Sequence, residues 1–238
     1  MEEESVTRRR NLENTSDKKE NMLPLYENLA LLLGDRHYIK LIHDPVSLSL
    51  RCAILSELIL NDFISLSSSN KVTIVSTSTD DVILLKTLNL IDKDNLSLSI
   101  KEWLEVLNGE NYKTRHQLKN TRKIIYKKLE ENNLIKYKNY LHKKSIQIID
   151  QRYKSILCNN LINYLIKKEV NLYYDVLICG LFYCKIINDL FVSLSPQQQS
   201  LCRFRVEDVL NRYRNYYKRE NVKEEMIALL LKAFLKKF

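Results

Sequence analysis

Apolar residues recur along most of the chain at intervals of three and four positions, the period of helices that bury one face. In the first half this period predicts four helices, at residues 23–33, 45–60, 81–91 and 100–107. Pro24 suits the first turn of the first helix, and Gly34 suits its C-terminal end. Ser99 and Gly109 bracket the fourth helix as caps. The β-rich run 72–75, which follows a Ser-rich turn, predicts a short strand between the second and third helices.

The second half is also predicted to be mainly helical, with one alternating segment. A long basic helix is predicted from Thr114 to about Asn132, and residues 134–149 alternate polar and apolar side chains as a short β-hairpin does. Three or four helices follow, the last of them at residues 224–238. The pattern therefore predicts a mainly α-helical fold, and 238 residues of which 45% are hydrophobic suffice for one sizeable core.

The N-terminal segment contains almost no large apolar side chains, so burial cannot offset the entropy of ordering it. We therefore predict a disordered tail at residues 1–21 and one globular domain at residues 22–238. Within the tail, Arg8, Arg9 and Arg10 form a compact basic cluster. Composition alone leaves this cluster open between a solvated segment and a docking motif.

Lys and Arg outnumber Asp and Glu by 38 to 29, and the formal charge of +9 favours a polyanionic partner, either nucleic acid or acidic lipid. Five cysteines without a CxxC pair, and no secretory leader ahead of them, indicate a reducing compartment. The most apolar runs, 28–33 and 176–183, are far shorter than the roughly 20 residues that a membrane-spanning helix needs. Any membrane contact is therefore expected to be peripheral.

The residue pattern contains no catalytic motif. Phosphate-cradling glycines, HExxH, GxSxG and paired cysteines for zinc are all missing from the sequence. The four histidines are scattered without metal-ligand spacing, and the adjacent pair His43 and Asp44 lacks a third catalytic partner. We predict a protein that is not an enzyme and that uses no cofactor or metal.

The densest positive charge lies in residues 113–128, which contain seven Lys or Arg and no acidic residue. On one continuous helix, a single stripe beside the apolar face would hold Arg115, Lys119, Arg122 and Tyr126. Cations held together in this way can bind a phosphate through charge-assisted hydrogen bonds. A solvated basic helix explains the same pattern, and the residue pattern alone favours it.

Arg51 is the second candidate, because its neighbours in the predicted helix 45–60 are strongly apolar. A guanidinium buried there would need an anionic partner. A bound anion could supply it, or Glu57 could supply it from within the protein.

Two blocks of sequence carry a family resemblance. The first block runs through residues 33–44 (LGDRHYIKLIHD) and 50–58 (LRCAILSEL). The second comprises residues 102–110 (EWLEVLNGE), 117–122 (QLKNTR) and 129–134 (LEENNL). In this order and at this separation the blocks resemble the Golgi phosphoprotein 3 family, which includes a yeast vacuolar-sorting counterpart. The resemblance covers roughly residues 22–238 and is clear up to about Ile135.

The resemblance implies a four-helix core surrounded by peripheral helices and short hairpins. It also implies a non-enzymatic protein on the cytoplasmic face of Golgi membranes, with a cytosolic pool, that binds phosphatidylinositol 4-phosphate. Such proteins sort glycosyltransferases in vesicle transport by linking their cytosolic tails to coatomer. The basic positions of the family's headgroup pocket correspond to Arg51, Lys119 and Arg122, and Ile42 stands where the family has a pocket Trp.

The chain departs from the family in two places. An indole supplies an apolar body and a hydrogen-bond donor at a membrane interface, so Ile42 puts the depth of membrane contact in question. The family's apolar hairpin, used for membrane contact and self-association, is shortened here to residues 137–144. Tyr140 and Leu141 are its expected membrane contacts, and homo-oligomerisation stays open. The tail cluster 8–10 resembles the arginines through which relatives bind coatomer.

A nucleic-acid-binding module is the alternative interpretation. The predicted helix 45–60 followed by short strands would suit a winged helix, and basic residues interleaved with Tyr126, Tyr137 and Tyr140 would suit contacts to phosphates and bases. The family resemblance favours the lipid partner and no nucleic acid.

Overall fold

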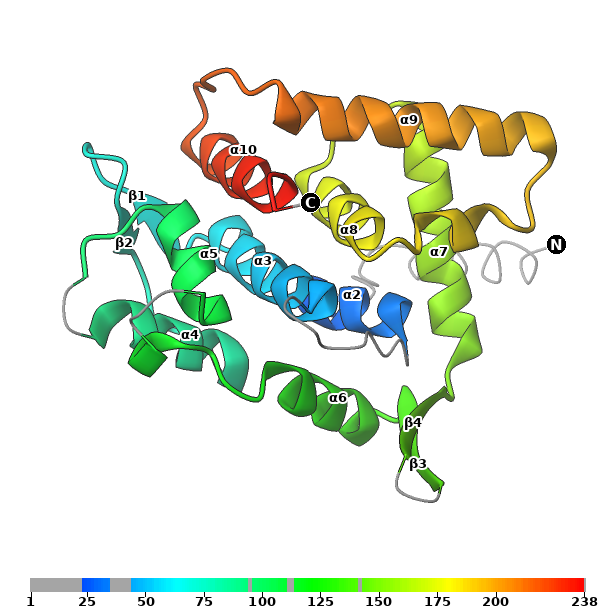
Figure 1. The fold of residues 1–238 in the computed structure, drawn as a ribbon, viewed down its shortest axis with the longest axis horizontal. Coiled ribbons are helices and arrows are strands. Elements are labelled where there is room, and N and C mark those ends of the chain that lie inside the picture. The colour runs from blue at the N-terminus through cyan, green and yellow to red at the C-terminus, as the bar shows by residue number, and fades with distance from the viewer. Residues whose placement is uncertain (1–22, 35–43, 94–95, 111–113, 141–142, 238) are drawn as a thin grey trace, which may run out of the picture.

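The computed structural model describes residues 23–34, 44–93, 96–110, 114–140 and 143–237. Within these residues the chain forms nine α-helices, two short 3-10 helices and two antiparallel strand pairs, all in one domain (Figure 1). The mainly helical fold predicted from the sequence is confirmed. None of the described helices combines the length and the apolar character needed to cross a bilayer.

The elements are labelled as in Figure 1. Those of the first half are α2 (Leu25–Leu33), α3 (Pro45–Leu60), β1 (Ile64–Leu66), β2 (Val72–Ile74), α4 (Val82–Asp92), α5 (Ile100–Asn108), the 3-10 helix η2 (Thr114–His116) and α6 (Thr121–Glu131). Those of the second half are β3 (Ile135–Tyr140), β4 (Lys143–Ile148), α7 (Gln151–Lys167), α8 (Leu172–Tyr183), the 3-10 helix η3 (Ile187–Phe191), α9 (Pro196–Arg214) and α10 (Val222–Leu235).

Helix α3 lies at the centre of the domain and packs against α2, α5, α8 and α10 (Figure 1). It begins with Pro45 at its first position, and the side chain of Asp44 accepts a hydrogen bond from the Ser47 amide, 3.3 Å away. Twelve of its sixteen residues are buried, which is typical of a helix enclosed by its neighbours on most sides.

The expected four-helix core consists of α2, α3, α8 and α10. Helix α3 contacts the other three, and α8 also contacts α2 and α10. Gly180 allows α2 to approach α8 closely, because a Cβ at this position would stand 3.0 Å from a methyl carbon of Leu29.

The other elements surround this core. Figure 1 shows α4, α6 and the β3–β4 hairpin along one edge of the domain, with the long helix α9 along the opposite edge. The hairpin predicted at residues 134–149 is confirmed, with Ile135 paired to Ile148 at its base. The predicted strand 72–75 is β2, which pairs with β1.

The predicted basic helix from Thr114 to Asn132 is wrong in its first part. Residues 114–116 form a 3-10 turn, Asn120 adopts a left-handed conformation with φ of 60°, and α6 begins at Thr121. The tertiary structure explains this break, because the amide of Leu118 donates to the carbonyl of Leu107, 3.0 Å away at the end of α5. That bond directs the backbone away from a helical path.

A buried carboxylate joins the outer helices to the core. Asp175 of α8 is fully buried, and its oxygens accept hydrogen bonds from Tyr164 of α7, Tyr213 of α9 and Arg212 of α9. The Arg212 Nη1 to Asp175 Oδ2 distance is 2.8 Å. Burial raises the pKa of Asp175, and the charge of Arg212 offsets part of that rise.

We expect Asp175→Asn to lower the free energy of unfolding by about 3 kcal/mol, because it leaves Arg212 without its buried counter-ion. Urea unfolding followed by circular dichroism measures this change. Asp208→Asn is the control, because it breaks only a surface pair with Arg205 and should cost less than about 1 kcal/mol. Equal losses in the two variants would contradict a special role for Asp175.

Candidate functional site

One of the predicted binding residues, Arg122, forms an ion pair at the N-terminus of α3, although it lies in a different helix. The Nη2 atom of Arg122, on α6, is 2.9 and 2.7 Å from the two carboxylate oxygens of Asp44. Asp44 is also the N-cap of α3, so one carboxylate both starts the central helix and holds α6 against it. The Arg122 side chain is 29% exposed, which leaves it accessible to a ligand.

Arg51 lies seven residues beyond Asp44, about two turns into α3, and is buried, with 5% of its surface exposed. Its Nε donates to the carbonyl of Leu107 and its Nη2 to the carbonyl of Leu118, both at 2.6 Å. Its Nη1 donates to the carbonyl and the hydroxyl of Ser47. Burial lowers the pKa of Arg51 to about 10, the Asp44 carboxylate opposes this shift, and the Arg122 charge adds to it.

These contacts decide between the two partners considered for Arg51. Glu57 is not its counter-ion, because the Oε2 of Glu57 accepts from the Leu25 amide at the start of α2, 2.6 Å away. The donors of Arg51 instead satisfy backbone carbonyls at the end of α5 and just before α6. Arg51 is therefore a structural clamp whose charge adds to that of Arg122.

Lys119 is exposed and lies in the turn just before α6, so it does not share a helical stripe with Arg122 as predicted. The backbone places Lys119 close to Arg51, because the carbonyl of the preceding residue, Leu118, accepts a hydrogen bond from Arg51. A further cation approaches from α4, where Nζ of Lys86 lies 3.4 Å from the carbonyl oxygen of Lys119.

For the remaining predicted site residues, the structure describes either nothing or the backbone alone. Ile42, Leu141 and the arginine cluster 8–10 fall outside the described residues. Tyr140 is the last residue of β3, and only its backbone is described. The binding roles predicted for all of these residues stay predictions.

Asp44 and Lys86 belong to this region but were not predicted as members of it. Asp44 followed by Pro45 at the start of an apolar helical pattern is an N-cap signal that could have placed Asp44 here, rather than beside His43 as a catalytic pair. Lys86 had no sequence signal, because its proximity to Lys119 depends on the packing of α4 against α6.

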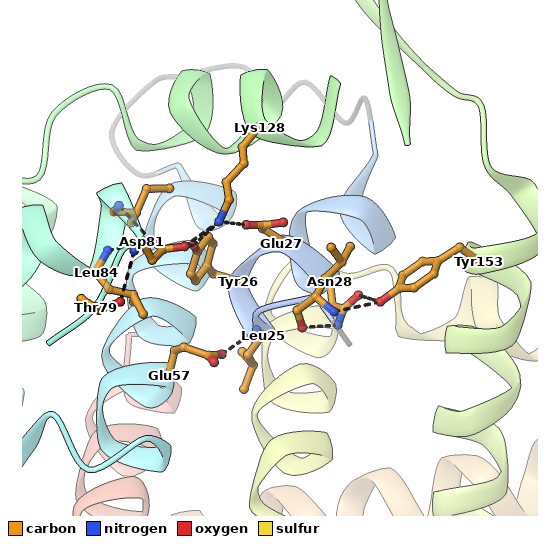
Figure 2. A network of polar contacts seen from close by, with 12 residues as sticks. Leu25, Tyr26, Glu27, Asn28, Glu57, Thr79, Asp81, Leu84, Lys128 and Tyr153 are labelled. Atoms are coloured by element: carbon orange, nitrogen blue, oxygen red, sulfur yellow. Dashed lines mark hydrogen bonds and ion pairs between the residues drawn. The ribbon is translucent and has the colours of Figure 1, made fainter. Parts of the chain in front are cut away.

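A buried polar network holds α6 in place. Figure 2 shows Lys128 reaching from α6 toward Asp81 and Glu27. Its Nζ lies 2.5 Å from a carboxylate oxygen of Asp81, the N-cap of α4, and 2.5 Å from one of Glu27 on α2. The hydroxyl of Tyr26 donates to the same Asp81 oxygen. The network therefore ties three elements together beside the helix that carries Arg122.

Burial disfavours the charged form of each member of this network, but the net pKa shifts differ in direction. Burial raises the pKa of Glu27, which is fully buried, and the bond to Lys128 offsets part of the rise. Burial also opposes ionisation of Asp81, but hydrogen bonds from Lys128, Tyr26 and the Leu84 amide outweigh it and lower the pKa. Contacts to both carboxylates likewise outweigh burial at Lys128 and raise its pKa.

The fold and the site describe a mainly helical, single-domain protein with a cluster of cations at one edge. No group of side chains among the described residues has the composition of a metal site. A family model described as Golgi phosphoprotein 3 (GPP34) matches residues 25–226. The chain therefore belongs to the Golgi phosphoprotein 3 (GPP34) family, and the resemblance noted from its sequence is confirmed.

Membership of this family supports a Golgi phosphoprotein 3-like role, with Golgi association and a part in membrane trafficking. The family consists of non-enzymatic adaptors, which agrees with the lack of a catalytic motif in the sequence.

We expect Arg51→Lys to lower the free energy of unfolding by about 2 kcal/mol or more. An ammonium group keeps the charge but cannot reach the carbonyls of Leu107 and Leu118 together, which leaves a buried acceptor unpaired. The matched control is Arg122→Lys, which alters a partly exposed pair and should cost less than about 1 kcal/mol. Urea unfolding of both variants makes the comparison, and similar losses would contradict the clamp.

We expect Lys128→Met to lower the free energy of unfolding by about 2 kcal/mol at pH 7, because a partly exposed cation is removed from one buried and one partly buried carboxylate. The difference from wild type should shrink as the pH falls to about 4. Protonation of Glu27, whose pKa is raised, removes the first partner, and protonation of Asp81, whose pKa is lowered, removes the second only at lower pH.

The control for this pH series is Lys127→Met, because Lys127 forms only an exposed pair with Glu131. Its effect should stay below about 0.5 kcal/mol throughout. Urea unfolding at several pH values provides the measurement. A loss for Lys128→Met that stayed constant or grew with acidification would contradict the ion network.

Proposed function

We propose that this protein is a peripheral adaptor on the cytoplasmic face of Golgi membranes and that it binds the headgroup of phosphatidylinositol 4-phosphate at the N-terminus of α3. The observation that carries this proposal is the meeting of Arg51, Asp44 and Arg122, from two separate helices, with Lys119 next to them. Membership of the Golgi phosphoprotein 3 family supports the Golgi association and the adaptor role.

In the proposed complex, Arg122 and Lys119 contact the phosphate. Arg122 is already held in place by Asp44, so little side-chain entropy is lost when it binds an anion. The arriving phosphate competes with the Asp44 carboxylate for the same guanidinium, which lowers the affinity but leaves Asp44 as the cap of α3. Charge-assisted hydrogen bonds from Arg122 and Lys119 would supply most of the binding energy.

Arg51 has a different role in this proposal from the direct phosphate contact that the resemblance implied. Four of its hydrogen bonds are made within the protein. It acts as a positioning residue that fixes the backbone ahead of Lys119, and its charge adds to the positive potential of the site.

The wider role follows from the family. We propose that the membrane-bound protein recognises cytosolic tails of glycosyltransferases and links them to coatomer, so that these enzymes are retained in the Golgi. The net charge of +9 supports attraction to an anionic membrane surface. The cluster at residues 8–10 is the proposed coatomer contact.

The nucleic-acid alternative loses its structural basis in α3. A winged helix needs an exposed recognition helix that can enter a groove of the duplex. Helix α3, which would have to be that helix, is enclosed by α2, α5, α8 and α10 and exposes little of its surface.

Co-sedimentation with vesicles that carry single phosphoinositides tests the proposal. Wild type should prefer vesicles with phosphatidylinositol 4-phosphate, and Lys119→Ala/Arg122→Ala should bind them at least about tenfold more weakly, because two charge-assisted contacts are lost.

The matched control is Lys123→Ala/Lys127→Ala, which removes the same charge from exposed positions of α6. It should keep the preference for the 4-phosphate lipid. If both double variants bind every acidic vesicle alike, with no preference among lipids, binding is non-specific and the proposed pocket is wrong.

A further inference from the structure

Helix α4 carries an unusual outward face. Its inward residues are buried against the core, as expected for an amphipathic helix, and comprise Ile83, Leu84, Thr87, Leu88 and Ile91. On the opposite side, Val82 is 66% exposed and Leu85 is 38% exposed. These two line a shallow surface depression together with Lys86, Asn89, Leu90 and Lys93. The outward face of α4 is therefore apolar along its middle and has lysines within it.

The outward face of α4 is adjacent to the proposed headgroup site. Lys86 belongs to this face, and its Nζ lies 3.4 Å from the carbonyl oxygen of Lys119 in the headgroup site. Helices α4 and α6 are in contact, and Figure 1 shows them along the same edge of the domain as the β3–β4 hairpin. A surface that takes a lipid headgroup at Lys119 would thus have α4 beside it.

The charges around the face suit an anionic surface. Lys86 and Lys93 have long aliphatic stems that can lie along apolar groups while the ammonium reaches phosphate oxygens. The carboxylate of Asp81 is engaged by Lys128 inside the protein and does not contribute to this face. Asp80 and Asp92 are exposed next to the face and remain free to stay in water.

The size of the face favours a lipid surface over a folded protein partner. Helix α4 has 11 residues and is about 16 Å long, at about 1.5 Å per residue. A stable protein interface usually covers about 800 Å² on each partner, far more than one short helix face offers. A bilayer needs no such area, because the headgroup contact already provides specificity and a few apolar side chains add to the affinity.

We propose that the outward face of α4, centred on Val82 and Leu85, lies against the interface of an anionic bilayer while the headgroup site is occupied. This inference rests on the proposed function and adds to it a second membrane contact, which inserts apolar side chains beside the headgroup. Contact with a second copy of the chain or with a client tail is an alternative that the experiment below separates from lipid contact.

The single tryptophan of the chain, Trp103, is fully buried and gives a constant background for a fluorescence test. Leu85→Trp places an indole on the proposed contact. The matched control is Leu201→Trp, at a 37% exposed position of α9, the helix that runs along the opposite edge of the domain (Figure 1). Vesicles of phosphatidylcholine with phosphatidylinositol 4-phosphate are added, with and without brominated acyl chains.

We expect the emission of Leu85→Trp to shift to shorter wavelength and to be quenched by the brominated vesicles, and that of Leu201→Trp to be unaffected. Absence of quenching at position 85 on vesicles that do sediment the protein overturns the inference and leaves the headgroup proposal standing. Failure of wild type to prefer these vesicles over pure phosphatidylcholine overturns both.

A second variant separates the two contacts. Val82→Gln/Leu85→Gln changes only exposed side chains, so we expect it to retain the fold. It should weaken binding to these vesicles about threefold to tenfold, because less apolar surface is buried, and leave the affinity for soluble glycerophosphoinositol 4-phosphate within about twofold. Unchanged vesicle binding, or a loss of self-association in sedimentation velocity without any change in vesicle binding, overturns the inference.

Discussion

The buried guanidinium of Arg51, on the central helix α3, needs hydrogen-bond acceptors for its donors. The arrangement of the candidate site depends on which groups supply these acceptors. The acceptors are the carbonyls of Leu107 and Leu118, which belong to the end of α5 and to the approach to α6. An unpaired donor at this depth would cost a large share of a domain's stability. Arg51 therefore fixes the path of the backbone that carries Lys119 and leads to Arg122.

The second constraint is the balance of charges around α6. Two carboxylates, Asp44 and Asp81, are the N-caps of α3 and α4, and each also pairs with a cation from α6. A helix cap usually satisfies local amides only, but here the same groups also set the position of a third helix. As a result α6 is held at both ends, by Arg122 near its start and by Lys128 near its end. These contacts fix the position of Lys119 and Arg122 at the N-terminal side of α6.

This arrangement gives the proposed membrane surface a division of roles. Arg51, which is buried, and Lys128, which pairs with two carboxylates, position the elements. Exposed Lys119 and partly exposed Arg122, which among the described residues pairs with Asp44 alone, are the residues proposed to contact an anion. The apolar outward face of α4 lies on the same edge of the domain, so specificity for a headgroup and affinity for a bilayer would come from neighbouring elements. Neither contribution requires a membrane-spanning helix.

The sequence by itself determined the helical class, the family and the approximate bounds of α3, α4, α5 and the β3–β4 hairpin. Helices α3 and α5 begin where they were predicted, at Pro45 and directly after Ser99, because caps and apolar periods act locally. The tertiary structure decided the rest. It moved the start of the predicted basic helix from Thr114 to Thr121, since the amide of Leu118 pairs with α5 rather than with its own turn. It also converted Arg51 into a clamp and brought Lys86 to Lys119, because such contacts join residues far apart in sequence, which local patterns do not record.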